Sequence, residues 1–249
     1  MRQKADLKEE LVSIPNRISL TCDLWTSCNT EGFICLTAHY VDSKWNLQSK
    51  IINFQHMPPP HTGFELCKKV FAFLHDWGIE KKIFTITLDN AFANDVLQKT
   101  LKSQLALQKE LDLIEYKEQV ASDIGKSQLD TYLEEAALNL HLTTHMDVLD
   151  WCETNSPRFP HLSIMSCDLL SIPVTTVASE SVFSIGSHIL NKYGNLLSSN
   201  CVEAIICTRN WKHGFNEDDD DLFDEDSIVK TTSSKGASNV VDVEENDNE

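Results

Sequence analysis

The segment Ile18-Ser-Leu-Thr-Cys-Asp-Leu-Trp25 decides the fold that we expect for this chain. Its apolar side chains stand at every second position from Ile18 to Leu24, with hydroxyl, carboxylate or indole groups between them. A period of two residues is typical of a β-strand, because successive side chains of a strand point to opposite faces of the sheet. The alternation predicts a strand over residues 17–25.

Two more strands follow at short intervals. Gly32 precedes a run of apolar and β-branched residues at 33–41, and a similar run occupies 47–54. Residues 42–46 have the composition of a turn, and Met57-Pro-Pro-Pro60 ends the series. Short connections between three strands predict an antiparallel meander.

A helix then separates the third strand from a fourth. Thr62 and Glu65 have the spacing of a capping box, apolar residues repeat with helical spacing to Trp77, and Gly78 is a typical stop. Residues 83–89 form the next strand. Because a helical crossover permits parallel pairing, we expect an α/β fold with a mixed sheet.

The second half of the chain has helical periodicity. Asn94 is predicted to cap a helix that carries Leu97, Leu101 and Leu105, and residues 109–126 form a junction without clear period. From residue 127 the apolar spacing predicts helices, including one over 178–190. Asn200 and Glu203 predict a capped start for the last of them.

The charge distribution excludes several classes of protein. The chain has 249 residues and a net charge of −17, and thirteen acidic against two basic residues fall in 216–249, which we predict to be a disordered acidic tail. The remaining body is mildly acidic, which argues against an autonomous DNA-binding module. No apolar run is long enough for a membrane span, no phosphate-binding loop is present, and eight cysteines without a signal peptide indicate reduced thiols.

Two carboxylates stand at predicted strand ends. Asp23 and Asp89 would lie side by side if their strands are adjacent and parallel, and a divalent Mg²⁺ or Mn²⁺ would relieve their repulsion. Glu180 is the candidate third ligand for a metal-dependent phosphodiester cleavage. The alternative is that strand-end aspartates only cap turns.

Other chemistry has weaker support. Serines near Glu180 lack the turn of a hydrolase nucleophile, so surface or capping roles are expected. We predict no zinc site, because no zinc-ligand spacing occurs in the group His39, His56, His61, His75, Cys35 and Cys67.

Several short motifs of the sequence resemble those of plant transposases of the hAT superfamily, including the RICESLEEPER-like zinc-finger BED proteins. The resemblance covers about residues 15–108 and 122–215. The motifs that support this resemblance are Thr21-Cys-Asp-Leu-Trp-Thr-Ser27, Thr87-Leu-Asp-Asn-Ala91, Gln128-Leu-Asp-Thr-Tyr-Leu-Glu-Glu135, Asp147-Val-Leu-Asp-Trp151, Leu170-Ser-Ile-Pro-Val174 and Ala178-Ser-Glu-Ser-Val-Phe-Ser184.

The resemblance implies an RNase H-like core whose Asp-Asp-Glu triad maps onto Asp23, Asp89 and Glu180. It also implies nuclear location, DNA association, and a C-terminal dimerisation region for homodimers or heterodimers with related hAT proteins. The residues assigned to dimerisation are Trp151, Leu162, Met165, Leu169, Leu170, Phe183, Val202, Ile205, Ile206 and Trp211. The alternative is that the aromatic and leucine positions of this half pack in the chain's own core.

The chain also departs from the family pattern, because no BED zinc finger is evident and only about 20 residues separate the two matching parts. We therefore expect an incomplete RNase H-like fold followed by an all-helical region, in a protein that dimerises, retains residual DNA binding and does not transpose. The alternatives are a metal-dependent nuclease using the triad, and an inert product. The predicted segments are a leader at 1–16, the core at 17–108, the junction at 109–126, the dimerisation region at 127–215 and the tail at 216–249.

Overall fold

The structure is a computed structural model. It describes residues 2–26, 32–58, 62–88, 99–101, 103, 127–136, 146–175, 181–184, 186 and 198–215. Residues 1–215 form one compact unit. Within these described ranges, no helix has both the length and the apolar character that a membrane crossing requires.

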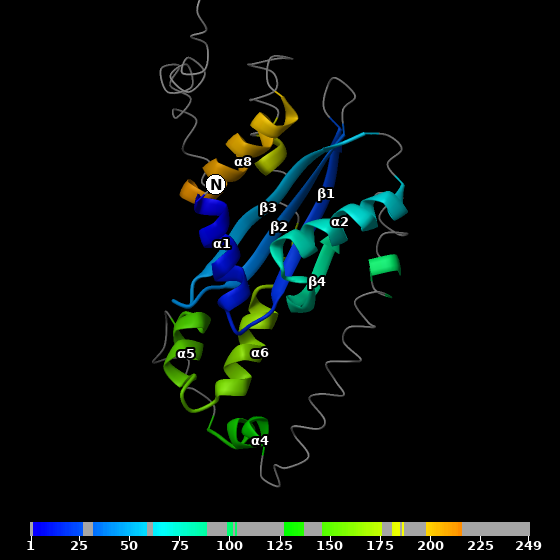
Figure 1. The fold of residues 1–249 in the computed structure, drawn as a ribbon. Helices are drawn as coiled ribbons and strands as arrows, with labels where there is room; N and C mark the ends of the chain where they lie inside the picture. The colour runs from blue at the N-terminus through cyan, green and yellow to red at the C-terminus, as the bar shows by residue number, and fades with distance from the viewer. Residues whose placement is uncertain are drawn as a thin grey trace, which may run out of the picture. The chain divides into compact units, whose positions relative to one another are not determined.

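A four-stranded mixed sheet lies at the centre of this unit (Figure 1). Its strands are β1 (Ile18–Thr26), β2 (Gly32–Val41), β3 (Leu47–Met57) and β4 (Ile83–Leu88), in the order β3-β2-β1-β4. β2 pairs antiparallel with both β1 and β3, whereas β4 pairs parallel with β1. The predicted α/β class with a mixed sheet is confirmed.

The crossover helix α2 (Gly63–Trp77) begins and ends where local chemistry predicts. The Thr62 hydroxyl accepts a hydrogen bond from the Glu65 backbone N–H at 3.3 Å. Gly78 ends the helix with φ = 69°, a left-handed conformation that glycine adopts without steric strain. This helix carries the chain back across the sheet, which is what allows β4 to run parallel to β1.

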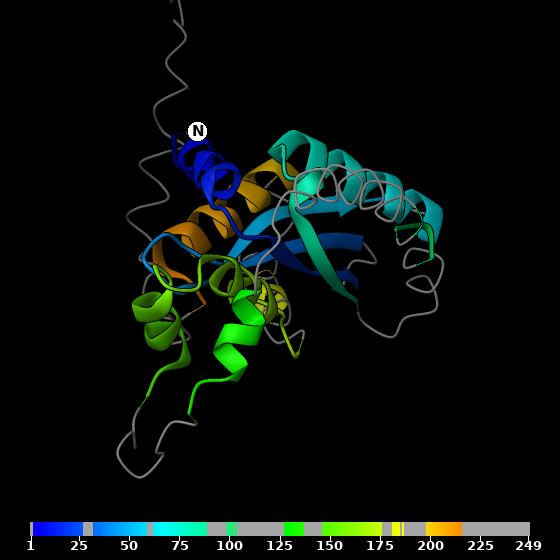
Figure 2. The same ribbon diagram turned by 90° about the horizontal axis from the view of Figure 1, so that it is seen from below.

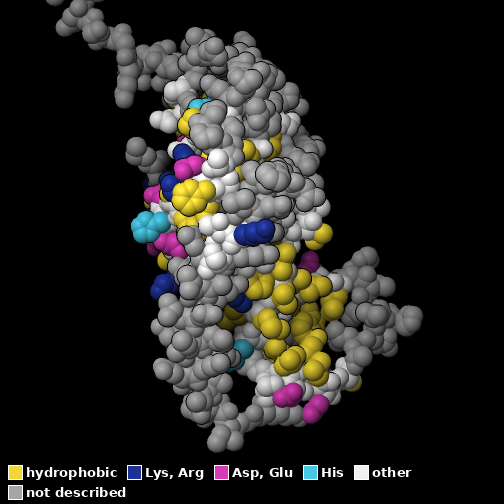
Figure 3. All heavy atoms as spheres, turned by 90° about the vertical axis from the view of Figure 1, so that its right-hand side faces the viewer, with side chains coloured by type: hydrophobic (Ala, Val, Ile, Leu, Met, Phe, Trp, Pro, Cys, Tyr) yellow, Lys and Arg dark blue, Asp and Glu magenta, His cyan; other side chains and the backbone are white. Residues whose placement is uncertain are grey.

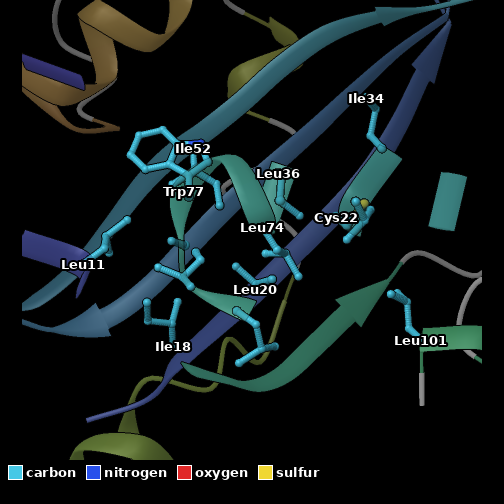
Figure 4. Close-up of a cluster of buried hydrophobic side chains, with 14 of the residues drawn as sticks. Leu11, Ile18, Leu20, Cys22, Ile34, Leu36, Ile52, Leu74, Trp77 and Leu101 are labelled. Atoms are coloured by element: carbon cyan, nitrogen blue, oxygen red, sulfur yellow. The ribbon is translucent and has the colours of Figure 1, made fainter. Parts of the chain in front are cut away.

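The apolar side of β1 faces a core that two helices cover. Ile18, Leu20 and Cys22 are at most 3% exposed and pack with Leu36 of β2 and Leu74 of α2 (Figure 4). The first sixteen residues are more than the predicted leader, because 2–13 form helix α1 (Arg2–Ser13). Its Leu7 and Leu11 belong to the same buried cluster.

The second half contributes the helices α4 (Gln128–Leu133), α5 (Val148–Asn155), α6 (Pro160–Leu170) and α8 (Ser199–His213). α5 and α4 contact α6, and α6 contacts β2. Figure 2 shows α1 and α2 on one side of the sheet and α6 on the other. The predicted helical character of this half is confirmed.

α8 lies along β3, which is the edge strand of the sheet. The side-chain oxygen of Asn210 accepts a hydrogen bond from the Ile51 N–H at 2.8 Å, and the Trp211 indole N–H donates to the Ile51 carbonyl at 2.7 Å. These bonds satisfy main-chain groups that an open edge would leave to solvent or to another strand. The region predicted as a separate dimerisation domain therefore shares one unit with the sheet.

Some local predictions need correction. α8 begins at Ser199 with Ser198 as N-cap, so the predicted cap at Asn200 is wrong and lies inside the helix. Of the helix predicted over 178–190, residues 181–184 and 186 are described and helical. Asn94, Leu97, Leu105, the junction 109–126 and the tail 216–249 lie outside the described residues, whereas Leu101 is helical and 2% exposed.

Candidate functional site

Asp23 is the one predicted triad residue that the structure describes. It lies near the end of β1 and is 5% exposed. Its cross-strand partner is Cys35 of β2, whose own partner is Phe54 of β3. Because directly opposed residues of antiparallel strands share a face, these three side chains form one row on the face away from α1 and α2.

The other two predicted triad residues, Asp89 and Glu180, lie outside the described residues. The surrounding geometry is informative. The parallel register of β1 and β4 ends at the pair Cys22 and Leu88, one residue before each aspartate. Phe183, three residues after Glu180, lies 6.5 Å from Phe54 between ring centroids. The helical turn after Glu180 thus packs on the face to which Asp23 points.

A polar row crosses the same face of the sheet. Nε2 of the His39 ring forms a hydrogen bond with the Thr21 hydroxyl at 3.1 Å, and Nδ1 forms one with the Ser49 hydroxyl at 2.9 Å. Ser19 meets Ser171, from the end of α6, at 3.3 Å between hydroxyl oxygens. Burial lowers the pKa of His39 to about 4, so this imidazole is neutral at pH 7. Through these two bonds the ring connects β2 to β1 and to β3.

Two buried thiols, those of Cys22 and Cys207, are kept protonated by their surroundings. Burial raises the pKa of Cys22 and of Cys207 to about 12, so neither is a thiolate at pH 7. His56 packs edge-on against Phe33, and His75 pairs with Glu80. No group of three metal-binding side chains occurs among the residues that the structure describes.

A cavity of about 470 Å³ lies away from Asp23, between α1 and the start of β3. Acidic and basic groups both line it, among them Glu10, Asp42 and Lys50. The Glu10 carboxylate already accepts from the Tyr40 hydroxyl, and Asp42 accepts from two backbone N–H groups of its turn.

The residues predicted for dimerisation separate into two groups. Val202 and Ile206 of α8 are 1% exposed and pack inside the chain, where a partner does not reach them. Trp211 meets Trp77 edge-on at 6.3 Å between centroids, and Trp151 packs similarly on Tyr132. Ile205 and Leu162 are half-buried. Val202 and Ile206 thus belong to the chain's own core, and the dimerisation role predicted for them stays a prediction.

The second group remains at the surface of α6. Met165, Leu169 and Leu170 are 46%, 51% and 38% exposed. Figure 3 shows apolar side chains gathered over this part of the molecule. Other exposed apolar residues, which sequence reasoning did not assign, are Leu129, Tyr132, Leu133, Met146, Val148, Ile164 and Val174. Their exposure could not be recognised from periodicity, because the same spacing serves a core.

One ion pair ties α6 to the sheet. The Asp168 carboxylate accepts from the Arg17 backbone N–H at 2.6 Å and from the Arg17 Nε at 2.8 Å. The side chain of Asp168 is 3% exposed and that of Arg17 is 44% exposed. A residue that precedes β1 thereby fixes a helix more than 150 positions later in the chain.

Comparison with known proteins also divides the chain into a part that contains the sheet and a later helical part. Residues 21–115 match the ZBED1 RNase-like domain, and residues 128–212 match the hAT family C-terminal dimerisation region. The chain is a hAT-family, transposase-like protein. In this hAT chain the first match covers the sheet from Thr21 of β1 onward with its crossover helix, and the second runs from α4 into α8.

Plant relatives support the assignment. The hAT chain is 41% identical over 96 residues to the putative AC transposase of Zea mays, which is 39% of this chain and 12% of that protein. It is 34% identical over 106 residues to the zinc finger BED domain-containing protein RICESLEEPER 2 of Oryza sativa subsp. japonica, 42% of this chain and 15% of that protein. The matched stretches thus span less than a fifth of these relatives.

Proposed function

We propose that this hAT chain works by dimerising through its C-terminal region and does not transpose DNA. Nuclear location and residual DNA association extend the proposal. Support for those two comes only from the names of the transposase and BED-protein relatives. The observation that carries dimerisation is the apolar surface of α4 and α6, inside the segment that matches a dimerisation region.

A surface of this kind is uncommon on a monomer. Large apolar side chains that are about half exposed normally occur singly in soluble proteins, and a contiguous group marks an interaction site. Here Leu133, Met165 and Leu169 are 69%, 46% and 51% exposed. Their helices are held to one another by Gln128, whose side-chain oxygen accepts from the His161 N–H at 3.0 Å.

Sedimentation equilibrium of the full 249-residue chain tests the proposal. We expect the average mass to rise from monomer to dimer between about 1 and 50 µM, the range of moderate protein affinities. A mass that stays at 28.2 kDa throughout would refute dimerisation. DNA association has its own test, the anisotropy of labelled duplex DNA at two salt concentrations, and binding that does not weaken with salt would contradict it.

A second candidate function is metal-dependent cleavage of DNA. It is favoured by the register that ends at Cys22 and Leu88, and by the packing of Phe183 on the face of Asp23. Asp23 is the only member of the set that the structure describes, and one carboxylate does not make a divalent-metal site. We therefore derive no catalytic step.

The two candidates differ in a direct assay. If the triad is active, the chain nicks terminal-repeat DNA with Mn²⁺ and the Asp89→Ala variant does not. Equal signals from wild type and variant would remove the cleavage hypothesis and leave dimerisation untouched.

A further inference from the structure

We infer that the cavity between α1 and the β2–β3 connection binds a basic amino acid, whose side-chain cation lies toward α1 and whose carboxylate lies toward the lysines of the opposite wall. This ligand site goes beyond the proposed dimerisation and does not depend on it.

The two walls of the cavity come from segments far apart in the fold. Gln3, Asp6 and Glu10 recur on α1 at intervals of three and four residues, which brings their side chains to one side of the helix. On β3, Gln48 and Lys50 lie two positions apart and therefore share a face of the strand. The space between the walls is about 470 Å³, a volume in the range of small-ligand sites.

The walls carry opposite charges that do not neutralise one another. Asp6 and Glu10 stand on α1, whereas Lys44 and Lys50 stand on the opposite wall. None of these four side chains takes part in an ion pair within the part of the chain that the structure describes. Charges held apart in this way are complementary to a ligand with a cation at one end and an anion at the other.

The hydrogen bond that Glu10 receives leaves its charge available. The Tyr40 hydroxyl donates to Glu10 Oε1 at 3.0 Å. Burial, and then the negative charges of Glu10 and Asp42, raise the pKa of Tyr40 above its usual range, so the phenol is a neutral donor at pH 7. A carboxylate has acceptor capacity for several donors, so Glu10 can also bind a cation.

The charge of the lining favours a basic amino acid over a neutral one. Three carboxylates, those of Asp6, Glu10 and Asp42, line the cavity together with two ammonium groups, those of Lys44 and Lys50. At pH 7 the lining therefore has one net negative charge, and a basic amino acid has one net positive charge.

The apolar part of the lining fits the aliphatic stem of such a ligand. Leu7 and Trp211 line the cavity between its charged groups. The Trp211 indole N–H donates to the Ile51 carbonyl at 2.7 Å, which fixes the orientation of the ring. Long cationic side chains commonly lay their methylene stems along apolar surface of this kind.

The rim of the cavity is held in a fixed conformation. The Asp42 carboxylate accepts from the backbone N–H groups of Lys44 and Asn46 at 2.8 and 2.9 Å. Between these two residues Trp45 has φ = 60°, a left-handed conformation that a bulky residue rarely adopts. Such positions persist where surrounding bonds over-determine them, and they are common at ligand-binding sites.

Titration of the full 249-residue chain with L-arginine tests the site. The signal to follow is the indole N–H of Trp211 in ¹H–¹⁵N correlation spectra, assigned by its loss in Trp211→Phe. We expect a saturating shift with a Kd of about 1 mM, ordinary for a ligand of about twelve heavy atoms in an open site.

Agmatine, which is arginine without the carboxylate, separates the site from diffuse attraction. The chain has a net charge of −17 and attracts a doubly charged cation more strongly than a singly charged one. If the carboxylate lies against the lysines, agmatine should nevertheless bind at least about threefold more weakly than arginine, because it lacks that ion pair.

Two variants locate the ends of the ligand. Lys50→Gln should raise the arginine Kd at least about threefold and leave the agmatine Kd within about 1.5-fold. Asp6→Asn should raise both Kd values about threefold, because it removes a partner of the cation that the two ligands share. Lys68→Gln is the matched control, since it makes the same change of charge on α2, where Lys68 pairs with Glu65, and it should keep the arginine Kd within about 1.5-fold.

Three results would overturn the inference. They are a Trp211 signal that does not move up to about 10 mM arginine, agmatine that binds as tightly as arginine, and a Lys50→Gln chain that binds arginine as Lys68→Gln does. Dimerisation would stand after each of them, because sedimentation equilibrium measures it separately.

Discussion

The pair of Arg17 and Asp168 offers the sharpest test of how the two matched regions hold together. In Asp168→Asn the side chain keeps its volume, but an amide NH₂ replaces one acceptor oxygen. One of the two bonds, at 2.6 and 2.8 Å, is then lost and the other loses its charge assistance. A hydrogen bond to a charged group contributes about 1.5–3 kcal/mol.

We take about 2 kcal/mol as the expected loss for Asp168→Asn, at the low end because Arg17 is 44% exposed and can be rehydrated. For a unit of this size that corresponds to a melting temperature lower by about 4–8 °C. Urea unfolding followed by circular dichroism measures the change in the free energy of unfolding.

Asp76→Asn is the control for this experiment. It removes a similar ion pair with Lys4 at 2.9 Å, but the two side chains are 47% and 63% exposed. We expect this control to change the free energy of unfolding by less than about 0.5 kcal/mol. If the two variants were equally stable, the argument that buried Asp168 anchors α6 would be refuted.

Three further predictions follow from the cores of the two regions. Ile206→Ala should lower the free energy of unfolding by about 2–4 kcal/mol in urea titrations, because it leaves a cavity beside β3. A loss below about 1 kcal/mol would contradict the packing of α8. Trp211→Phe should lower it by about 1 kcal/mol in the same assay, since the Ile51 carbonyl loses its indole donor; no change would mean that water replaces the bond. His39 has a pKa of about 4 in the folded chain and about 6.5 when unfolded. Between these values the unfolded state binds one more proton, so the free energy of unfolding falls by about 3 kcal/mol as the pH drops from 6.5 to 4. His39→Gln should flatten that part of the stability profile, measured by urea titration at each pH. An unchanged slope would show that His39 is not buried and neutral.

Much of the sheet could be predicted because its signals are local. Alternation within 18–24, the turn at 42–46 and the cap at Thr62 each act over a few residues, and the structure has β1, β3 and α2 at those places. The parallel pairing of β1 with β4 could also be predicted, because a helix between two strands allows the second strand to run parallel to the first.

Local signals failed where competing ones lay close together. Ser198 and Asn200 both suit a helix cap, and the structure uses Ser198, two residues before the predicted start. The charged composition of residues 1–16 concealed Leu7 and Leu11, whose burial depends on a sheet formed later in the chain.

The sequence alone determined the strand order along the chain, the crossover and the presence of helices beyond residue 127, because hydrophobic period and capping chemistry are properties of neighbouring residues. Tertiary structure alone decided which faces are buried. Ser19 and Thr21 alternate like the outward side of a strand, yet both are 0% exposed. Ser171 at the end of α6 contacts Ser19, and His39 of β2 contacts Thr21. The same apolar spacing placed Ile206 in the core and Leu169 at the surface, since burial depends on distant contacts such as that of Arg17 with Asp168, which no local pattern contains.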